Sequence, residues 1–267
     1  MMERHPFQSI VLIGTGRLAE QWCALFTENN IPLKQLVGRS KDRLDELSGG
    51  KLDCALGFSE MIRDADLYIL AVSDDAIQTV SDLLPAVSAL VVHCSGSVHL
   101  DALKKHHRRG VFYPLQTFSA GRKINWGEVP ICVCASEAND KALLHSLTVL
   151  FNGRYFDVDN SQRKQLHLAA VFVNNFVNHH LAVAERLCVD QELDFSVLFP
   201  LMRETLAKAM DGNAFAAQTG PARRGDDKVI ARQAADLENY PVWKALYSAT
   251  TDSINRSYTE LDENGEG

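Results

Sequence analysis

The sequence lacks several features that mark well-known classes of protein. No apolar run reaches the roughly 18 residues that a membrane-spanning helix needs. The first eight residues are polar and lead straight into an apolar run, so we expect no signal peptide. The six cysteines are scattered and include no CxxC pair, which gives no reason to expect a zinc site or a disulfide framework. We therefore expect a cytoplasmic protein with reduced thiols, no membrane partner and no metal.

Positive charge is also scarce relative to negative charge. The chain has 27 Lys and Arg residues against 34 Asp and Glu residues, a formal net charge of −7. This balance provides no overall positive potential that would attract a polyanion, so we expect no nucleic-acid partner. A local basic pocket is still compatible with it. What the chain does have is 46% hydrophobic residues over a length of 267, enough for two domains with packed cores.

The first half of the chain alternates between strand and helix patterns. Continuous apolar runs, typical of strands buried on both faces, cover residues 9–13, 34–37, 67–72, 89–93, 111–113 and 130–134. Helical spacing of apolar residues falls between them, over 18–26, 41–47 and 75–84. Repeated strand–helix–strand units of this length predict an α/β domain over residues 1–157, with a Rossmann-type, doubly wound and mainly parallel sheet.

After about residue 157 the strand pattern gives way to helical periodicity. One long helix is predicted from residue 161 to 189, followed by helices at 195–210, 226–237 and 242–258. The sequence therefore predicts an all-helical C-terminal domain over residues 158–267. Long apolar helices favour burial against a second copy, so we expect a homodimer formed through this domain.

A glycine-rich motif, GxGxxA, follows the first predicted strand and opens the first helix. It runs Gly14-Thr15-Gly16-Arg17-Leu18-Ala19. The first glycine permits a tight turn, the second lets the backbone approach a pyrophosphate, and the alanine keeps helix and strand close. The helix N-terminus adds free N–H groups for the phosphates. In this strand–turn–helix context the motif predicts a dinucleotide site formed by residues 14–18; the alternative is a merely structural turn.

The end of the second predicted strand indicates which dinucleotide fits. An NAD site usually places Asp or Glu about 20 residues after the motif, where it binds the ribose 2′-hydroxyl. Here the strand ends in Gly38-Arg39-Ser40-Lys41, with no carboxylate. Arg39 can stack on adenine and bind a 2′-phosphate, and Ser40 can add a hydrogen bond. This favours NADP(H) over NAD(H) as cofactor, although solvated cations at a helix start would also explain Lys41.

Four further motifs resemble those of one bacterial protein family. They span residues 71–77 (AVSDDAI), 93–96 (HCSG), 113–118 (YPLQTF) and 219–226 (TGPARRGD). The family has a Rossmann-like domain followed by a helical domain of unknown function, and the resemblance covers nearly the whole chain. It is similar to pyrroline-5-carboxylate reductases, deazaflavin-dependent NADP oxidoreductases and prephenate dehydrogenases, in the 6-phosphogluconate-dehydrogenase-like group.

The resemblance implies a nicotinamide site and a helical domain that often pairs two subunits. The chain departs from the family pattern at Tyr113, where the family usually has His. A phenol, with a pKa near 10, does not titrate near neutrality. In doubly wound sheets, ligands lie at the carboxyl ends of the strands. We therefore expect Val72, Ser73 and Ser95 to lie around the cofactor together with residues 14–18, which we call the phosphate loop.

The first long helix of the second half carries a polar strip. His167, Asn174 and Asn178 are spaced by seven and four residues, so they share a helix face, and Asn175 lies beside them. We interpret His167 as a proton donor or substrate clamp and Asn175 as a hydrogen-bonding residue that orients the substrate. The alternative is a histidine and amides that brace a domain interface, since buried polar groups need partners.

Two adjacent arginines, Arg223 and Arg224, follow a Gly-Pro turn between predicted helices. They could bind a carboxylate or phosphate of the substrate, or the neighbouring Asp226 could cap the next helix while an arginine pairs with a carboxylate. Taken together, the residues predict an NADP(H)-dependent oxidoreductase that transfers a hydride to or from a small polar carbonyl or imine substrate. A non-catalytic NADP(H)-binding sensor is the alternative.

Overall fold

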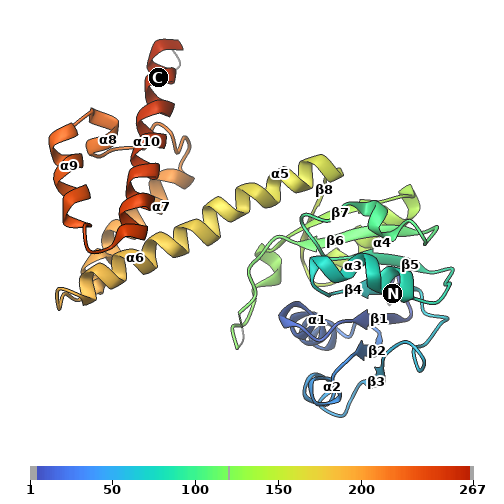
Figure 1. Cartoon of the computed structure of the whole chain (residues 1–267). Coiled ribbons are helices and arrows are strands. Elements are labelled where there is room, and N and C mark those ends of the chain that lie inside the picture. Colours follow the sequence, from blue (N-terminus) through green and yellow to red (C-terminus); the bar gives the residue numbers. More distant parts are fainter. Residues whose placement is uncertain (1–4, 120, 265–267) are drawn as a thin grey trace. The chain divides into compact units, whose positions relative to one another are not determined.

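The computed structural model describes residues 5–119 and 121–264. The chain forms two compact units, Met1–Phe176 and Val177–Gly267, which are described in turn (Figure 1). The sheet ends at Asp157, next to the predicted boundary at 157/158. The division between the units lies further on, inside the long helix that follows the sheet.

The first unit is built on an eight-stranded sheet. Its order is β3-β2-β1-β4-β5-β6-β7-β8. The strands are β1 (Ile10–Ile13), β2 (Leu33–Gly38), β3 (Asp53–Leu56), β4 (Leu67–Leu70), β5 (Leu90–His93), β6 (Arg109–Pro114), β7 (Pro130–Ala135) and β8 (Arg154–Asp157). Every neighbouring pair is parallel except β6 and β7. The strand order reverses between β1 and β4, so the predicted Rossmann-type, doubly wound and mainly parallel sheet is confirmed.

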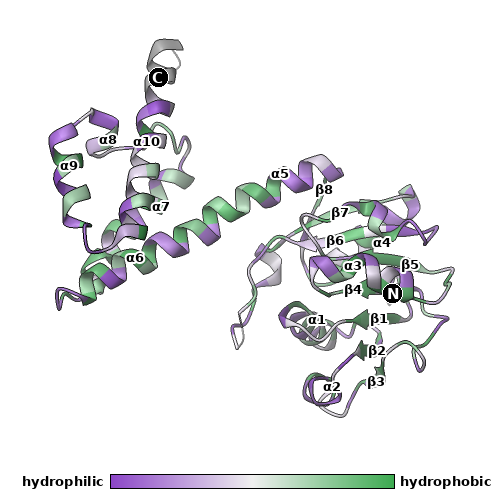
Figure 2. Cartoon of the chain, in the orientation of Figure 1, coloured by the Kyte–Doolittle hydropathy of each residue, from purple (hydrophilic) through white to green (hydrophobic). Residues whose placement is uncertain are grey.

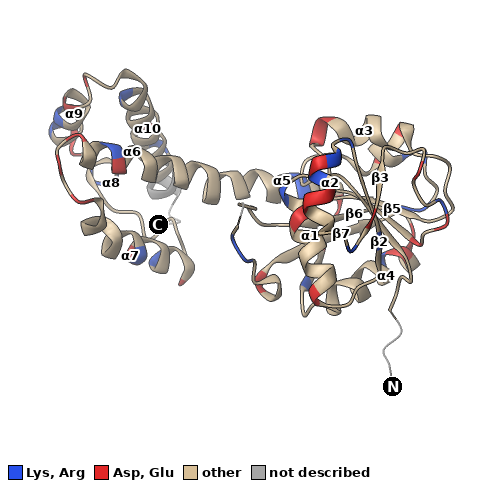
Figure 3. Ribbon diagram, turned by 90° about the horizontal axis from the view of Figure 1, so that it is seen from below, with Lys and Arg blue, Asp and Glu red and all other residues tan. Residues whose placement is uncertain are grey.

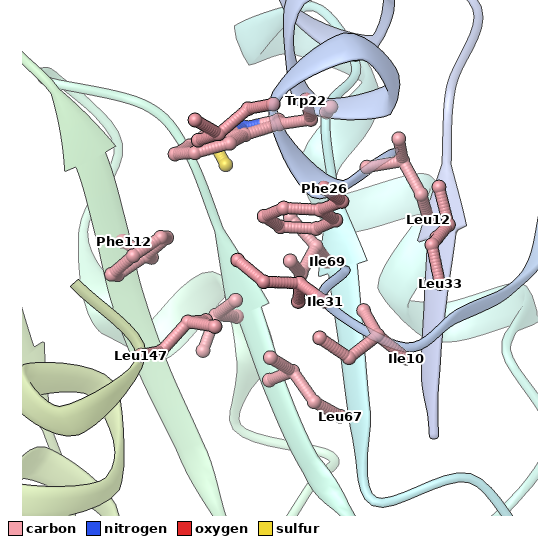
Figure 4. Close-up of a cluster of buried hydrophobic side chains, with 14 of the residues drawn as sticks. Ile10, Leu12, Trp22, Phe26, Ile31, Leu33, Leu67, Ile69, Phe112 and Leu147 are labelled. Atoms are coloured by element: carbon pink, nitrogen blue, oxygen red, sulfur yellow. The ribbon is translucent and has the colours of Figure 1, made fainter. Parts of the chain in front are cut away.

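Helices cover both faces of this sheet. They are α1 (Arg17–Glu28), α2 (Lys41–Ser48), α3 (Asp74–Leu83) and α4 (Ala138–Val149). A further helix, α5 (Asn160–Ala170), follows β8 and has only Arg163 buried. Alternate residues of β1 enter different cores: Ile10 and Leu12 join Trp22 of α1, whereas Val11 and Ile13 join the cluster beneath α3. Figure 4 shows the first of these clusters. Burial on both faces explains why the central strands are continuous apolar runs in the sequence.

The second unit is helical throughout its described part. Its elements are α6 (Val177–Val189), a 3₁₀ turn (Phe195–Leu198), α7 (Phe199–Met210), α8 (Pro221–Arg224), α9 (Asp227–Asp236) and α10 (Pro241–Asn264). This confirms the predicted helical C-terminal region. Figure 2 shows that apolar and polar stretches alternate along α6. None of the helices among the described residues combines the length and apolarity that crossing a membrane requires.

Between α5 and α6 the helix changes its hydrogen-bonding pattern. Val171–Phe176 form a π-helix, in which each N–H bonds to the carbonyl five residues back instead of four. One residue is thereby added to the turn, and the side chains that follow are rotated backwards around the helix axis. Segments of this kind are rare and frequently occur at functional sites.

Candidate functional site

The phosphate loop has the geometry that its sequence predicts. Gly14 has φ of 124°, and a Cβ built there would lie 2.2 Å from the carbonyl oxygen of Ala71. Its N–H donates to the carbonyl of Val37, which ties the turn to the end of β2. Gly16 differs, because a Cβ there would meet nothing within 4 Å. The loop is therefore closely packed at Gly14 and open at Gly16, where the first turn of α1 begins.

A cavity of about 350 Å³ lies beside this loop, at the carboxyl ends of β1, β2 and β4. Its walls include the predicted cofactor residues Gly14, Thr15, Gly16, Arg39, Val72 and Ser73. The lining also includes Phe58, Ala76, Thr79, Val80 and Leu83, which the sequence does not predict as cofactor residues. Among these residues only Ala76 lies in a motif, AVSDDAI; the place of the others in the cavity depends on how α3 and the segment after β3 pack.

The remaining predicted cofactor residues lie outside the lining of this cavity. Arg17 and Leu18 form the first turn of α1, directly after the loop. Ser40 is the N-cap of α2, where its hydroxyl accepts the N–H of Arg43. Ser95 is buried, and its hydroxyl accepts the N–H groups of Ser97 and Val98, so this side chain holds its own turn together.

Arg43 links α2 to the phosphate loop, a role that the sequence does not reveal. Its guanidinium donates to the carbonyl of Thr15 at 3.3 Å and pairs with Glu46 and Glu20. Figure 3 shows that α2 carries basic and acidic residues together. Gly38 adds to this packing, since a Cβ there would lie 2.6 Å from the Thr15 methyl group.

A second cavity, of about 580 Å³, lies within the first unit between the segment after β6 and the long helix. Both predicted catalytic residues, His167 and Asn175, line it. The other lining residues are Tyr113, Leu115, Gln116, Thr117, Leu166, Ala169, Ala170, Val171, Val173 and Asn174. Asn178, which the sequence places on the face of His167, belongs to the second unit and is not part of this lining.

The π-helix explains why Asn175 reaches the cavity wall with His167. In a regular α-helix Asn174, seven residues after His167, would share its face. The extra residue in the π-turn brings Asn175 toward that same face. Both amides line the cavity as a result, next to the imidazole.

His167 is held by a tyrosine from the sheet. The Tyr113 hydroxyl lies 3.0 Å from His167 Nδ1, and the two rings meet edge to face at 69°. Tyr113 is only 9% exposed, and burial raises the pKa of its phenol to about 12. The phenol therefore stays protonated at neutral pH and acts as a hydrogen-bonding partner of the imidazole.

Two buried polar residues fix the surroundings of this pair. His93 is fully buried, its Nδ1 accepts the N–H of Ser95, and burial lowers the pKa of its imidazole to about 3. Its imidazole is therefore neutral at physiological pH. Arg163, one turn before His167, is 1% exposed and donates to the carbonyl of Val98 and the side chain of Asn160. These bonds anchor α5 to the loop after β5, and so place His167 near the carboxyl end of the sheet.

The arginine motif of the second unit has visible structural uses. The Asp226 carboxylate accepts the N–H of Val229 and caps α9, as one of the two interpretations expects. The Arg223 guanidinium lies over the ring of Tyr258, 4.8 Å from its centroid, and the Tyr258 hydroxyl donates to the carbonyl of Phe215. Arg224 is exposed. Among the described residues, no group of His, Cys, Asp or Glu could hold a metal ion.

Comparison with known proteins identifies the family. The model for "Domain of unknown function (DUF2520)" matches residues 129–254. A Bacteroides fragilis protein of known structure, provisionally named an NADP oxidoreductase, is 33% identical over 95% of this chain and 100% of its own, with a TM-score of 0.85. The chain belongs to this Rossmann-like family. None of the curated proteins matches the sequence.

Two more distant structures share the fold. A pyrroline-5-carboxylate reductase from Streptococcus pyogenes is 15% identical, with a TM-score of 0.59 over 93% of this chain and 98% of its own. A reductive aminase from Aspergillus terreus, solved with NADPH and ethyl-5-oxohexanoate, is 14% identical, with a TM-score of 0.66 over 97% of this chain and 95% of its own. The resemblance to reductases of this group is confirmed at the level of fold.

Proposed function

We propose that this protein is an NADP(H)-dependent oxidoreductase that transfers a hydride between the nicotinamide and a carbon atom of a small polar carbonyl or imine substrate. The observation that carries the proposal is the placement of two cavities in one Rossmann unit. The phosphate loop and Arg39 line one, and His167, Asn174 and Asn175 line the other. The family relative provisionally named an NADP oxidoreductase supports the same reaction class.

The residues of the first cavity suit a dinucleotide with a 2′-phosphate. The open space at Gly16 admits a pyrophosphate close to the backbone, which any side chain there would obstruct. Arg39 lines the cavity at the end of β2, where an NAD-specific site would carry a carboxylate. In this proposal residues 14–18 hold the pyrophosphate, Arg39 and Ser40 hold the 2′-phosphate, and Val72, Ser73 and Ser95 border the nicotinamide. The bound cofactor supplies or accepts the hydride.

The residues of the second cavity would donate the proton that the reduction requires, or accept it in the reverse direction. Reduction of a carbonyl or imine adds a hydride to carbon and a proton to oxygen or nitrogen, so a donor must lie beside the substrate. His167 takes this role, since histidine is the side chain that most often serves as a general acid or base. The amide of Asn175 orients the substrate through a hydrogen bond. A panel of small ketones and cyclic imines, assayed by NADPH consumption, tests this assignment. Tight NADPH binding without turnover of any of these compounds would favour the alternative function, a non-catalytic NADP(H)-binding sensor.

Replacement of Arg39 tests the choice of cofactor. Because Arg39→Ala removes the guanidinium proposed to bind the 2′-phosphate, we expect the Kd for NADPH to rise about 10- to 100-fold while that for NADH changes little. Titration calorimetry with both cofactors measures this, with Lys41→Ala as the control that should keep the preference. The assignment is wrong if the wild type binds NADH as tightly as NADPH.

The proposal also includes a cytoplasmic homodimer formed through the helical unit. Several large apolar side chains on α7 are exposed in the single chain, among them Leu201 at 64% and Met210 at 79%. Exposed apolar surface of this kind favours burial against another copy. Light scattering should give twice the mass of one chain, and Leu201→Glu should shift the protein toward monomers. A monomeric wild type at micromolar concentration would contradict this arrangement.

A further inference from the structure

We propose that Tyr113 and Gly96 are positioning residues for His167, and that together they hold its imidazole with Nδ1 engaged and Nε2 left for proton exchange with the substrate. The inference rests on the proposed role of His167 as proton donor. It goes beyond that role because it assigns functions to Tyr113, whose phenol does not titrate near neutrality, and to Gly96, which has no side chain.

Three separate segments of the first unit meet at this point. Tyr113 comes from β6, Gly96 from the loop after β5, and His167 from α5. The Tyr113 hydroxyl is 3.0 Å from Nδ1 of His167, and the edge-to-face contact of the rings limits rotation of the imidazole. One ring nitrogen is thus occupied by a residue of the sheet. The nitrogen that remains for a ligand of the second cavity is Nε2.

Gly96 makes this contact sterically possible. A Cβ built on Gly96 would lie 2.6 Å from His167 Nδ1 and 2.7 Å from Tyr113 Cζ, closer than real Cβ atoms come to other groups. Both rings therefore pack directly against the Gly96 backbone. Unlike Gly14, Gly96 has no φ in the positive range that favours glycine, so space is the reason for glycine at this position.

The hydrogen bond has a defined direction in the acidic form of the histidine. Both nitrogens of an imidazolium are donors, so Nδ1–H donates to the phenolic oxygen of Tyr113. When Nε2–H passes its proton to the substrate oxygen or nitrogen, the bonding pair stays on Nε2 and the ring becomes neutral. Nδ1–H and its bond to Tyr113 are unchanged, and the phenol keeps its own proton. Solvent then reprotonates Nε2.

The surroundings of Tyr113 keep the phenol neutral. Burial has the largest effect and raises its pKa, and Cys132 and Asp74 act in the same direction, while Arg163 opposes them. A neutral phenol can serve as a hydrogen-bond acceptor throughout the cycle described above. Tyr113 thus contributes a hydrogen bond in the position where the family usually has His, and this role needs no titration of the phenol.

Two substitutions at residue 113 separate the hydrogen bond from ring packing. Tyr113→Phe keeps the ring and removes the hydroxyl, so we expect kcat to fall about tenfold or more, with KM and the Kd for NADPH within twofold. Tyr113→His should restore most of kcat, because an imidazole can also hydrogen-bond Nδ1 of His167. Wild-type kcat in Tyr113→Phe would overturn the proposal.

Gly96→Ala tests the steric part. We expect kcat to fall at least tenfold because the added methyl group displaces both rings, while NADPH binding persists. Gly127→Ala is the matched control in the same unit, since its Cβ would meet only ordinary contacts at 3.5 Å. Equal kcat values for the two variants, both folded by thermal melting, would contradict the role of Gly96.

An activity-independent measurement separates this inference from the proposed function. In ¹⁵N NMR spectra, the Nδ1 shift of His167 should change on Tyr113→Phe, whereas the imidazole of the exposed His179 should not. If the wild type turns over no substrate and the Nδ1 shift still changes, the proposed function fails and the contact stands. If both His167 nitrogens have the same shifts in the two proteins, the positioning role is wrong.

Discussion

Gly16→Val is expected to weaken NADPH binding about a hundredfold or more without a measurable loss of stability. A Cβ at Gly16 meets nothing within 4 Å in the free protein, and its backbone is extended, with φ of −82°. The folded chain therefore has room for the first side-chain carbon at this position. The same space is where the pyrophosphate would approach the backbone, so the added side chain would push the phosphates away from the helix N-terminus. Titration calorimetry and thermal melting measure the two effects separately.

Gly14→Ala provides the matched contrast within the same loop. Its Cβ would lie 2.2 Å from the Ala71 carbonyl oxygen, and φ of 124° strains any residue with a side chain. We expect this variant to lose about 2–3 kcal/mol of folding free energy, measured by chemical denaturation. Equal NADPH affinities for Gly16→Val and the wild type would contradict the assignment of the loop to the pyrophosphate.

His167→Ala is expected to lower kcat about 10²- to 10⁴-fold, the range that a general acid contributes. Its imidazole lines the second cavity, whereas the dinucleotide residues line the first, so the Kd for NADPH should stay within twofold. Stopped-flow single turnovers at saturating NADPH measure the chemical step directly.

Gln165→Ala is the control for this substitution on the same helix. Gln165 is exposed and lies outside the lining of the second cavity, so its truncation should leave kcat unchanged. If His167→Ala keeps wild-type kcat, the proton must come from another group, and the interpretation of His167 as a structural histidine would be preferred.

The features predictable from the sequence are those with local physical causes. Strands β1, β4 and β5 are buried on both faces, which leaves continuous apolar runs in the sequence. The GxGxxA motif is recognisable because the turn at Gly14 has a positive φ and no space for a Cβ, and so demands glycine. Helix α1 follows from the spacing of its apolar residues.

The features that were missed depend on distant contacts. Strands β3 and β8 are short edge strands, and β8 is exposed throughout, so neither leaves an apolar run. The antiparallel direction of β7 has no signature in its own residues. The contact between Tyr113 and His167 joins residues 54 positions apart in the sequence, so no local pattern predicts it.

The central claim is that a hydride moves between the nicotinamide bound at the phosphate loop and a substrate beside His167. NADPH deuterated at C4 on one face or the other, incubated with a panel of small ketones and imines, tests it by mass spectrometry of the products. We predict that deuterium enters the product from one face only, and that His167→Ala suppresses this transfer. Tight NADPH binding with no deuterium in any product from either label would contradict the account.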